Sequence, residues 1–187
     1  MDTPAVTVLV LVGSLHQGSA NGKLAQLAIS HAPAGMTLHQ YAGLAQLPFY
    51  NEDIERNLPA NVGALREAAE AADAILFVSP EHNGTIPAVL KNAIDWLSRP
   101  VYGSGALTGK PVAVIGAALG GGGGINAHND TRRSVTVALA HVVADSTLAI
   151  PASAAAFNNP AHLDRLLPQL TDVLTRVQDT INQRAPK

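Results

Sequence analysis

The 187-residue chain contains no cysteine, which excludes disulfides, thiolate catalysis and iron–sulfur ligation. Any redox chemistry therefore needs a bound organic cofactor or metal ligands other than thiolates. The seven histidines form neither a His-x-x-x-His nor a His-Glu-x-x-His pair, so we expect no metal site. The chain has 12 Lys and Arg against 14 Asp and Glu, a net charge of −2 that offers no basic field for nucleic acid.

Long hydrophobic runs are also missing. No stretch of about 18 apolar residues is present, which argues against a membrane span. The first four residues lack the basic region of a signal peptide, so we expect a cytoplasmic protein with no membrane partner. The length, with 47% apolar residues, suits one domain over residues 1–187 that buries a substantial core.

Short apolar runs alternate with amphipathic segments along the chain, a pattern typical of repeated strand–helix units. The predicted strands are residues 6–12, 36–41, 74–78, 111–116 and 145–150. The predicted helices are residues 20–31, 60–72, 86–97, 125–143 and 160–182. This α/β pattern predicts a flavodoxin-like three-layer sandwich around a five-stranded parallel sheet of order 2-1-3-4-5.

A polar loop follows the first predicted strand and leads into a helix. Backbone N–H groups and the helix dipole converge on an anion in such a loop. Ser14, Ser19 and Asn21 add short donors suited to a phosphate, and His16 is a further candidate partner. Neither Gly-x-Gly-x-x-Gly nor Gly-Lys-Ser/Thr occurs here, so a monophosphate fits better than a dinucleotide. The alternative is that Ser19 or Asn21 only caps the helix.

A second polar loop follows the third predicted strand. Glu81, His82 and Asn83 precede Gly84 and have backbone and amide groups that suit a heteroaromatic ring. The alternative is a plain strand-to-helix turn, with a permissive backbone at Gly84, a helix cap at Thr85 and a proline in the first turn.

Five consecutive glycines mark a third loop, residues 117–124, after the fourth predicted strand. Glycine is suitable where a side chain would block a ligand or a neighbouring backbone, although a mobile surface loop would read the same way. The loops after the first, third and fourth strands meet at one edge of the sheet, where the strand order reverses. We therefore expect a binding site there.

Four strings of residues carry a resemblance to a known family. They are Gly13-Ser14-Leu15 with Gly18-Ser19 and Asn21; Leu47-Pro48-Phe49-Tyr50-Asn51 with Asp53; Ser79-Pro80-Glu81 with Asn83-Gly84 and Pro87; and Leu90-Lys91-Asn92-Ala93-Ile94-Asp95-Trp96-Leu97-Ser98-Arg99-Pro100. Over roughly residues 6–145 the chain resembles the NADPH-dependent FMN reductases, which include related quinone, chromate and azo reductases.

The resemblance implies a flavodoxin-like domain that binds FMN, with the phosphate in the first loop and the isoalloxazine ring against the second and third. The implied cofactor contacts are Ser14, His16, Ser19, Ala20, Asn21, Pro80, Glu81, His82, Asn83, Gly84, Ala118 and Gly120. Many members of the family carry arginine where His16 stands, tyrosine where His82 stands and a serine where Ala117 and Ala118 stand. The first departure implies weaker or pH-sensitive FMN retention.

The implied activity is that of an oxidoreductase passing hydride or electrons from NADPH, with NADH possible instead, through FMN to a small acceptor. The acceptor would be a free flavin, quinone, azo compound or metal ion. Such a reaction needs positioned rings more than side-chain chemistry, so we name no catalytic acid, base or nucleophile. The alternatives are a flavodoxin-like electron carrier and a flavin-free binding module.

The same resemblance implies a homodimer or homotetramer. Trp96, Leu97 and Arg99, beside the segment 49–54, are candidates for the interface, since aromatic and arginine residues are enriched at interface cores. Trp96 fits an ordinary core position equally well.

Overall fold

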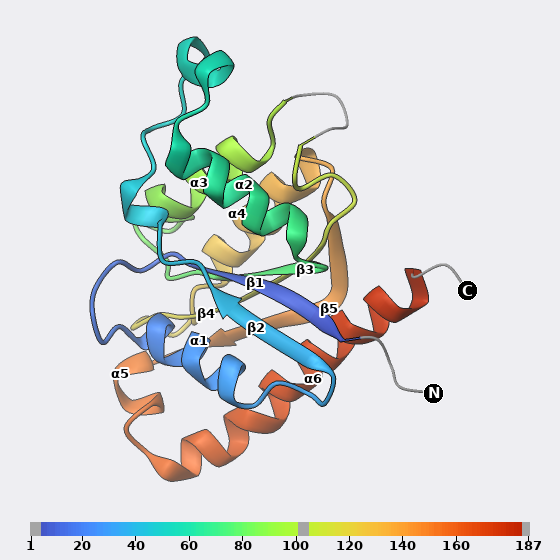
Figure 1. Ribbon diagram of the computed structural model, residues 1–187. Helices are drawn as coiled ribbons and strands as arrows, with labels where there is room; N and C mark the ends of the chain where they lie inside the picture. The colour runs from blue at the N-terminus through green and yellow to red at the C-terminus, as the bar shows by residue number, and fades with distance from the viewer. Residues whose placement is uncertain (1–4, 101–104, 185–187) are drawn as a thin grey trace.

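The computed structural model describes residues 5–100 and 105–184. A parallel five-stranded sheet of order β2-β1-β3-β4-β5 forms its centre (Figure 1). The strands are β1 (Val6–Val12), β2 (Met36–Gln40), β3 (Ala74–Val78), β4 (Pro111–Ala117) and β5 (His141–Ile150). The predicted flavodoxin-like fold and strand order are therefore confirmed.

The central strands are apolar along almost their whole length because helices cover both of their faces. Every residue of β3 and β4 is buried, as are six of the seven residues of β1. Continuous apolar runs of this kind are typical of strands inside a parallel sheet. The edge strand β2 buries only Met36 and Leu38, which point to the same face.

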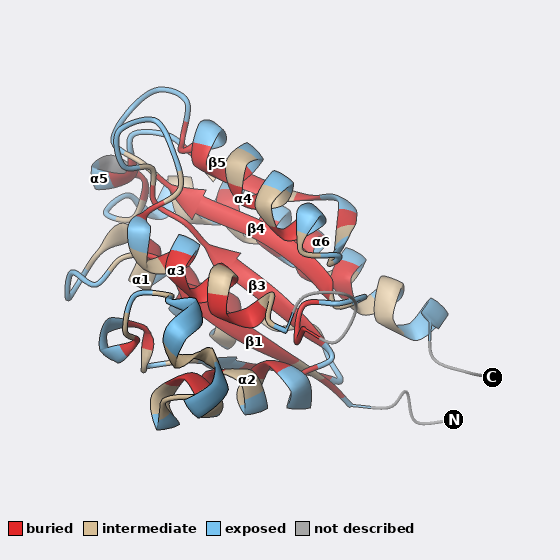
Figure 2. Ribbon diagram, turned by 90° about the horizontal axis from the view of Figure 1, so that it is seen from above, coloured by how far each residue is buried: buried red, intermediate tan, exposed pale blue. Residues whose placement is uncertain are grey.

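Two hydrophobic clusters fill the space between the sheet and its helices. On one face, Val8 and Val10 pack in a cluster with α1 (Ala20–Ser30) and α6 (Pro160–Arg184). On the other face, Leu9 and Leu11 pack with α2 (Ala60–Ala71), α3 (Ala88–Leu97) and α4 (Ile125–Val137). Figure 2 shows the buried residues concentrated along the strands and on the sheet-facing sides of the helices.

The boundary between α4 and β5 differs from the prediction. We expected a helix over residues 125–143 and a strand over residues 145–150, but α4 ends at Val137 and β5 begins at His141. Leu139 has a φ of 64°, a left-handed conformation that cannot continue the helix. The apolar run after it joins the sheet, where Val142 pairs with Val112 before a bulge around Asp145 shifts the register.

Smaller corrections concern the ends of the other helices. The helix predicted from residue 86 begins at Ala88, with Pro87 at the N-cap and no side-chain cap, so Thr85 is not the cap that the turn alternative placed there. The irregular stretch after β2 holds two short 3-10 helices, η1 (Leu44–Gln46) and η2 (Glu52–Asn57). A short helix, α5 (Ser153–Ala156), was not predicted, and part of the turn predicted over residues 102–110 lies outside the described residues.

Trp96 and Leu97 belong to the core. Both are 0% exposed, so the predicted surface role is wrong for them and the core alternative for Trp96 is correct. The indole N–H of Trp96 donates to the carbonyl of Pro48 at 2.8 Å, and its ring meets the edge of Tyr50 at 5.0 Å between centroids. The Arg99 guanidinium lies 4.6 Å above the Tyr50 ring, which ties the irregular stretch to α3.

None of the helices in the described ranges is both long and apolar enough to cross a membrane.

Candidate cofactor site

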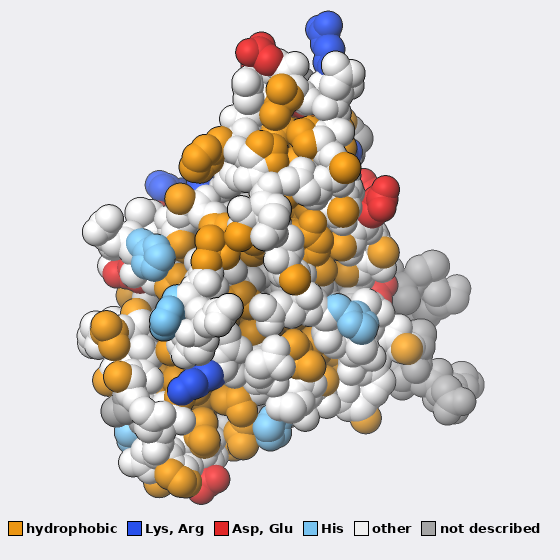
Figure 3. All heavy atoms as spheres, turned by 60° about the vertical axis from the view of Figure 1, so that its left-hand side comes forward, with side chains coloured by type: hydrophobic (Ala, Val, Ile, Leu, Met, Phe, Trp, Pro, Cys, Tyr) orange, Lys and Arg blue, Asp and Glu red, His pale blue; other side chains and the backbone are white. Residues whose placement is uncertain are grey.

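A cavity of about 610 Å³ opens at the carboxyl edge of the sheet. The loops after β1, β3 and β4 line it, as do residues of α5 and the turn after it. Of the twelve predicted contacts, ten line this cavity, namely Ser14, His16, Ser19, Ala20, Asn21, Pro80, Glu81, His82, Ala118 and Gly120. Figure 3 turns this side of the molecule toward the viewer and shows hydrophobic and histidine side chains among polar groups.

The first loop ends in a well-formed helix start. Gly18 takes a φ of 74°, and Ser19 is the N-cap of α1, its hydroxyl oxygen accepting from the N–H of Gly22 at 3.0 Å. The next two N–H groups, of Ala20 and Asn21, donate to no acceptor within the described residues, as expected for the first turn of a helix. These donors and the positive end of the helix dipole face a cavity, an arrangement that binds anions.

Asn21 connects the start of α1 to the end of β4. Its side-chain amide donates to the carbonyl of Ala117 at 2.8 Å, and its side-chain oxygen accepts from the N–H of Ala117 at 2.9 Å. The side chain, 3% exposed, thus fastens α1 to the end of β4 through its amide. Ser19 both caps the helix and lines the cavity.

The second loop is held by hydrogen bonds to α4. The Glu81 carboxylate accepts from the backbone N–H groups of Asn126 at 3.0 Å and Ala127 at 3.3 Å, near the positive end of the α4 dipole. The carboxylate therefore fixes the loop and supplies negative charge to a helix start. Glu81 still lines the cavity beside Pro80 and His82.

Asn83 and Gly84 do not line the cavity. Both have positive φ values, 51° and 77°, and His82 and Thr85 exchange two backbone hydrogen bonds of 3.1 Å around them. This is the geometry of a two-residue type I′ turn, for which Asn-Gly is the preferred pair. The turn alternative therefore accounts for these two residues in the structure.

The glycines of the third loop differ in the space around them. Gly123 and Gly124 have φ values of 62° and 92°, and a β-carbon on Gly123 would lie 2.8 Å from the backbone of β5. Gly120 and Gly121 have open space around the position of a β-carbon. A β-carbon on Gly122 would make only an ordinary contact with Ile125, at 3.6 Å. Of Gly120 and Gly121, which have the most room, only Gly120 lines the cavity.

Two features of this edge were not predicted from the sequence. Ser153, Ala154, Phe157 and Asn158 close one side of the cavity, and their position directly after β5 was the available signal. The other feature is His128 of α4, which is 0% exposed behind the second and third loops and has no hydrogen-bond partner among the described residues. Burial lowers the pKa of His128 to about 4, although the nearby Ser79 carbonyl opposes this shift.

Comparison with known proteins shows the family. The model of the family described as NADPH-dependent FMN reductase matches residues 6–155, which include all three loops. The chain belongs to this family. A quinone reductase of Pseudomonas putida is 43% identical to this FMN reductase over 130 residues, 69% of each chain. An NAD(P)H-dependent FMN reductase of Pseudomonas aeruginosa is 37% identical over 159 residues, 84% of each chain.

A solved structure extends the likeness to almost the whole FMN reductase. The flavoenzyme NAD(P)H:(acceptor) oxidoreductase of Paracoccus denitrificans is 31% identical, with a TM-score of 0.84, and the match covers 95% of this chain and 98% of that one. The protein is therefore an NAD(P)H-dependent FMN oxidoreductase of flavodoxin-like fold that uses FMN.

The residues of the cavity fit FMN. One end offers the free N–H groups of Ala20 and Asn21 and the hydroxyls of Ser14 and Ser19, which match a phosphate. The other end is bounded by the backbone of Pro80 and the glycine loop, where few side chains obstruct a flat ring. No group of three or more potential metal ligands occurs within the described residues.

Proposed function

We propose that this FMN reductase passes reducing equivalents from NADPH or NADH through FMN to a quinone or a similar small acceptor. Several relatives support the choice of acceptor by their names, among them the quinone reductase of Pseudomonas putida and a 2-hydroxy-1,4-benzoquinone reductase of Burkholderia, 39% identical over 116 residues. We further propose that residues 1–187 form one FMN-binding domain. The cytoplasmic location stays a prediction.

The observation that carries the proposal is the cavity at the reversal of strand order, lined by three loops within the family match. When bound, FMN supplies the electron-transfer chemistry. The N–H groups of Ala20 and Asn21, with Ser14 and Ser19, hold the phosphate and so set the depth of the cofactor.

The second and third loops then position the ring. Glu81 is anchored on α4, so the backbone of Pro80 and His82 is held in place, while Ala118 and Gly120 leave one side of the ring open to a donor or acceptor. Two substrates that bind in succession at the same open face of the ring need positioning more than acid–base groups.

We propose that the active form is a homodimer or homotetramer. Leu15, Phe49 and Leu119 are 59%, 81% and 78% exposed, and all three lie on segments that follow the carboxyl ends of strands. A second copy of the chain would cover large apolar side chains of this kind, which are exposed to solvent in the single chain. A purified protein that light scattering shows to be monomeric would contradict this assembly.

A pair of neighbouring glycines tests the site. Gly120 and Gly121 both have space for a side chain, but only Gly120 lines the cavity. Gly120→Leu should raise the FMN Kd by about tenfold or more and slow NADPH oxidation in the presence of a quinone, because the leucine fills space that the ring needs. Gly121→Leu is the matched control and should leave both unchanged. Equal effects of the two substitutions, or none from the first, would contradict the proposed site.

A further inference from the structure

The cavity has a single fixed positive charge at the end where the phosphate is expected. Of the residues that line it in the described part of the chain, Lys23 is the only lysine or arginine. The one carboxylate among them, that of Glu81, accepts from backbone N–H groups of α4. A bound phosphate dianion would therefore meet Lys23 as its principal cation.

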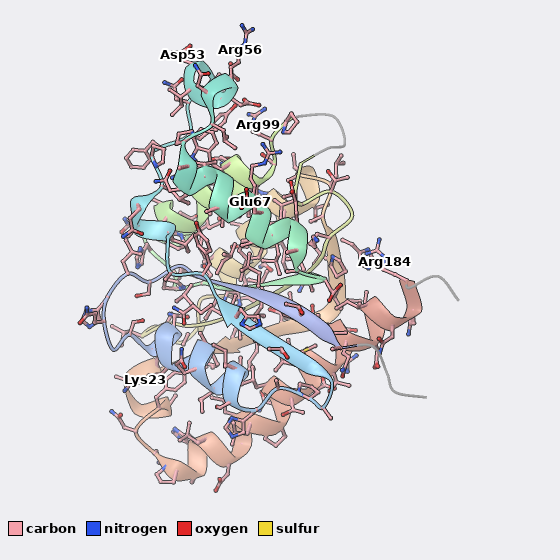
Figure 4. All side chains as sticks on the ribbon, viewed as in Figure 1. Lys23, Asp53, Arg56, Glu67, Arg99 and Arg184 are labelled. Carbon is pink, nitrogen blue, oxygen red and sulfur yellow. The ribbon has the colours of Figure 1, made fainter. Side chains whose placement is uncertain are left out.

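The position of Lys23 on α1 directs it to that end. Lys23 follows the N-cap Ser19 by four residues and Ala20 by three, so the three residues share one face of the helix. Side chains on a helix lean toward its N-terminus, which carries the lysine back over the first turn and its free N–H groups. Figure 4 shows Lys23 on α1 on the side of α5, the helix that closes the cavity.

Lys23 also has no competing anion. From residue 13 to residue 30 the first loop and α1 contain no aspartate or glutamate, and within the described residues Lys23 forms no ion pair. The first turn of α1 has no acidic side chain to balance its dipole. Lys91 on α3 differs in this respect, since it pairs with Asp95 at 2.6 Å.

A second cavity adjoins the first along α1, with a volume of about 750 Å³. It shares Ser14, His16, Ser19 and Lys23 with the cofactor cavity and continues past Gln26 toward β2. Lys23 therefore stands where the two cavities meet, with room to reach a phosphate in the first one.

We propose that Lys23 binds the phosphate of FMN and supplies the fixed positive charge of the phosphate subsite. This inference rests on the proposed function. Lys23 contacts the cofactor's phosphate and takes no part in the redox step. Its contribution depends on charge and on the phosphate, so it should be present for FMN and absent for riboflavin, which has the same ring and no phosphate.

The test compares the two flavins on the same variants. The Kd values of FMN and riboflavin are measured by quenching of flavin fluorescence at neutral pH, at low and at high salt, for the wild type, Lys23→Met, Lys23→Arg and Lys91→Met.

We expect Lys23→Met to raise the FMN Kd about tenfold, because one charge-assisted hydrogen bond is lost, and to leave the riboflavin Kd unchanged. Lys23→Arg should retain FMN affinity, and Lys91→Met is the control that removes a paired lysine. The FMN Kd of the wild type should rise more steeply with salt than that of Lys23→Met.

An unchanged FMN Kd in Lys23→Met, or equal weakening of FMN and riboflavin, would overturn the role of Lys23 while leaving the proposed function standing. A wild-type protein that binds neither flavin would overturn the proposed function and this inference with it.

Discussion

His128 should make the folded protein sensitive to mild acid. Its imidazole is 0% exposed and unpartnered within the described residues, and burial lowers its pKa from 6.5 to about 4. The nearby charge of Arg132 lowers the pKa further, whereas the Ser79 carbonyl and the carboxylate of Glu81 oppose the shift. Below pH 6.5 the unfolded chain accepts a proton that the folded chain resists, so stability is complete above that pH and falls as the pH approaches 4.

The size of the effect follows from the two pKa values. Each pH unit between them costs about 1.4 kcal/mol, so the free energy of unfolding should fall by about 2 kcal/mol from about pH 6.5 to about pH 5 through His128 alone. Across the whole interval the loss is about 3 kcal/mol. This is a large fraction of the stability of an ordinary domain.

Urea denaturation of the wild type and of His128→Phe at about pH 7 and about pH 5 measures this contribution. The wild type should lose about 2 kcal/mol more than the variant, because titration of the remaining groups is common to both. His39→Gln, which removes an exposed histidine, should behave as the wild type. Equal losses in the wild type and His128→Phe, or a His128 NMR resonance that titrates near pH 6.5 in the folded protein, would contradict a buried, neutral His128.

Three further substitutions test the packing around the site by urea denaturation. Gly116→Ala would place a β-carbon 1.9 Å from the backbone carbonyl oxygen of Ser79 in the second loop. We therefore expect the free energy of unfolding to fall by about 3 kcal/mol, or the variant not to fold. A fall of less than about 1 kcal/mol would be inconsistent with the structure. Asn21→Leu removes both hydrogen bonds to Ala117 and leaves buried backbone groups unpaired. The free energy of unfolding should therefore fall by about 3 kcal/mol. An unchanged free energy of unfolding would mean that this contact contributes nothing to stability. Trp96→Phe removes the donor to Pro48 and some buried volume, and should cost about 1–2 kcal/mol, whereas a more stable variant would speak against this contact.

The sheet was predictable because its strands are defined by local patterns. Residues 74–78 and 111–116 are nearly all apolar, and the segments between strands have helical spacing, so the strand order followed from the flavodoxin-like arrangement. The start of β5 was not predictable in the same way. Val142 and Val143 continue the apolar spacing of α4, and only the left-handed backbone at Leu139 and pairing with β4 place them in the sheet.

The site was predicted as a set of loops, but the roles of single side chains were less accessible. Asn21 looked like a phosphate donor because it lies at a helix start, yet its amide pairs with the backbone of a strand that is distant in sequence. Glu81 was expected at the ring, and its carboxylate also accepts hydrogen bonds from the start of α4 while the residue lines the cavity. Such long-range hydrogen bonds depend on tertiary packing, and no local pattern records them. Lys23 was overlooked because an exposed lysine on a helix ordinarily faces solvent.

The most direct test of the proposed electron transfer is the visible absorbance of the purified protein. The absorbance is recorded with added FMN, again after addition of NADPH under anaerobic conditions, and again after addition of a quinone. We expect the flavin spectrum to change on binding, NADPH to bleach the flavin band, and the quinone to restore it. A bound flavin that stays oxidised with both NADPH and NADH, or a protein that binds no FMN, would contradict the proposed electron transfer.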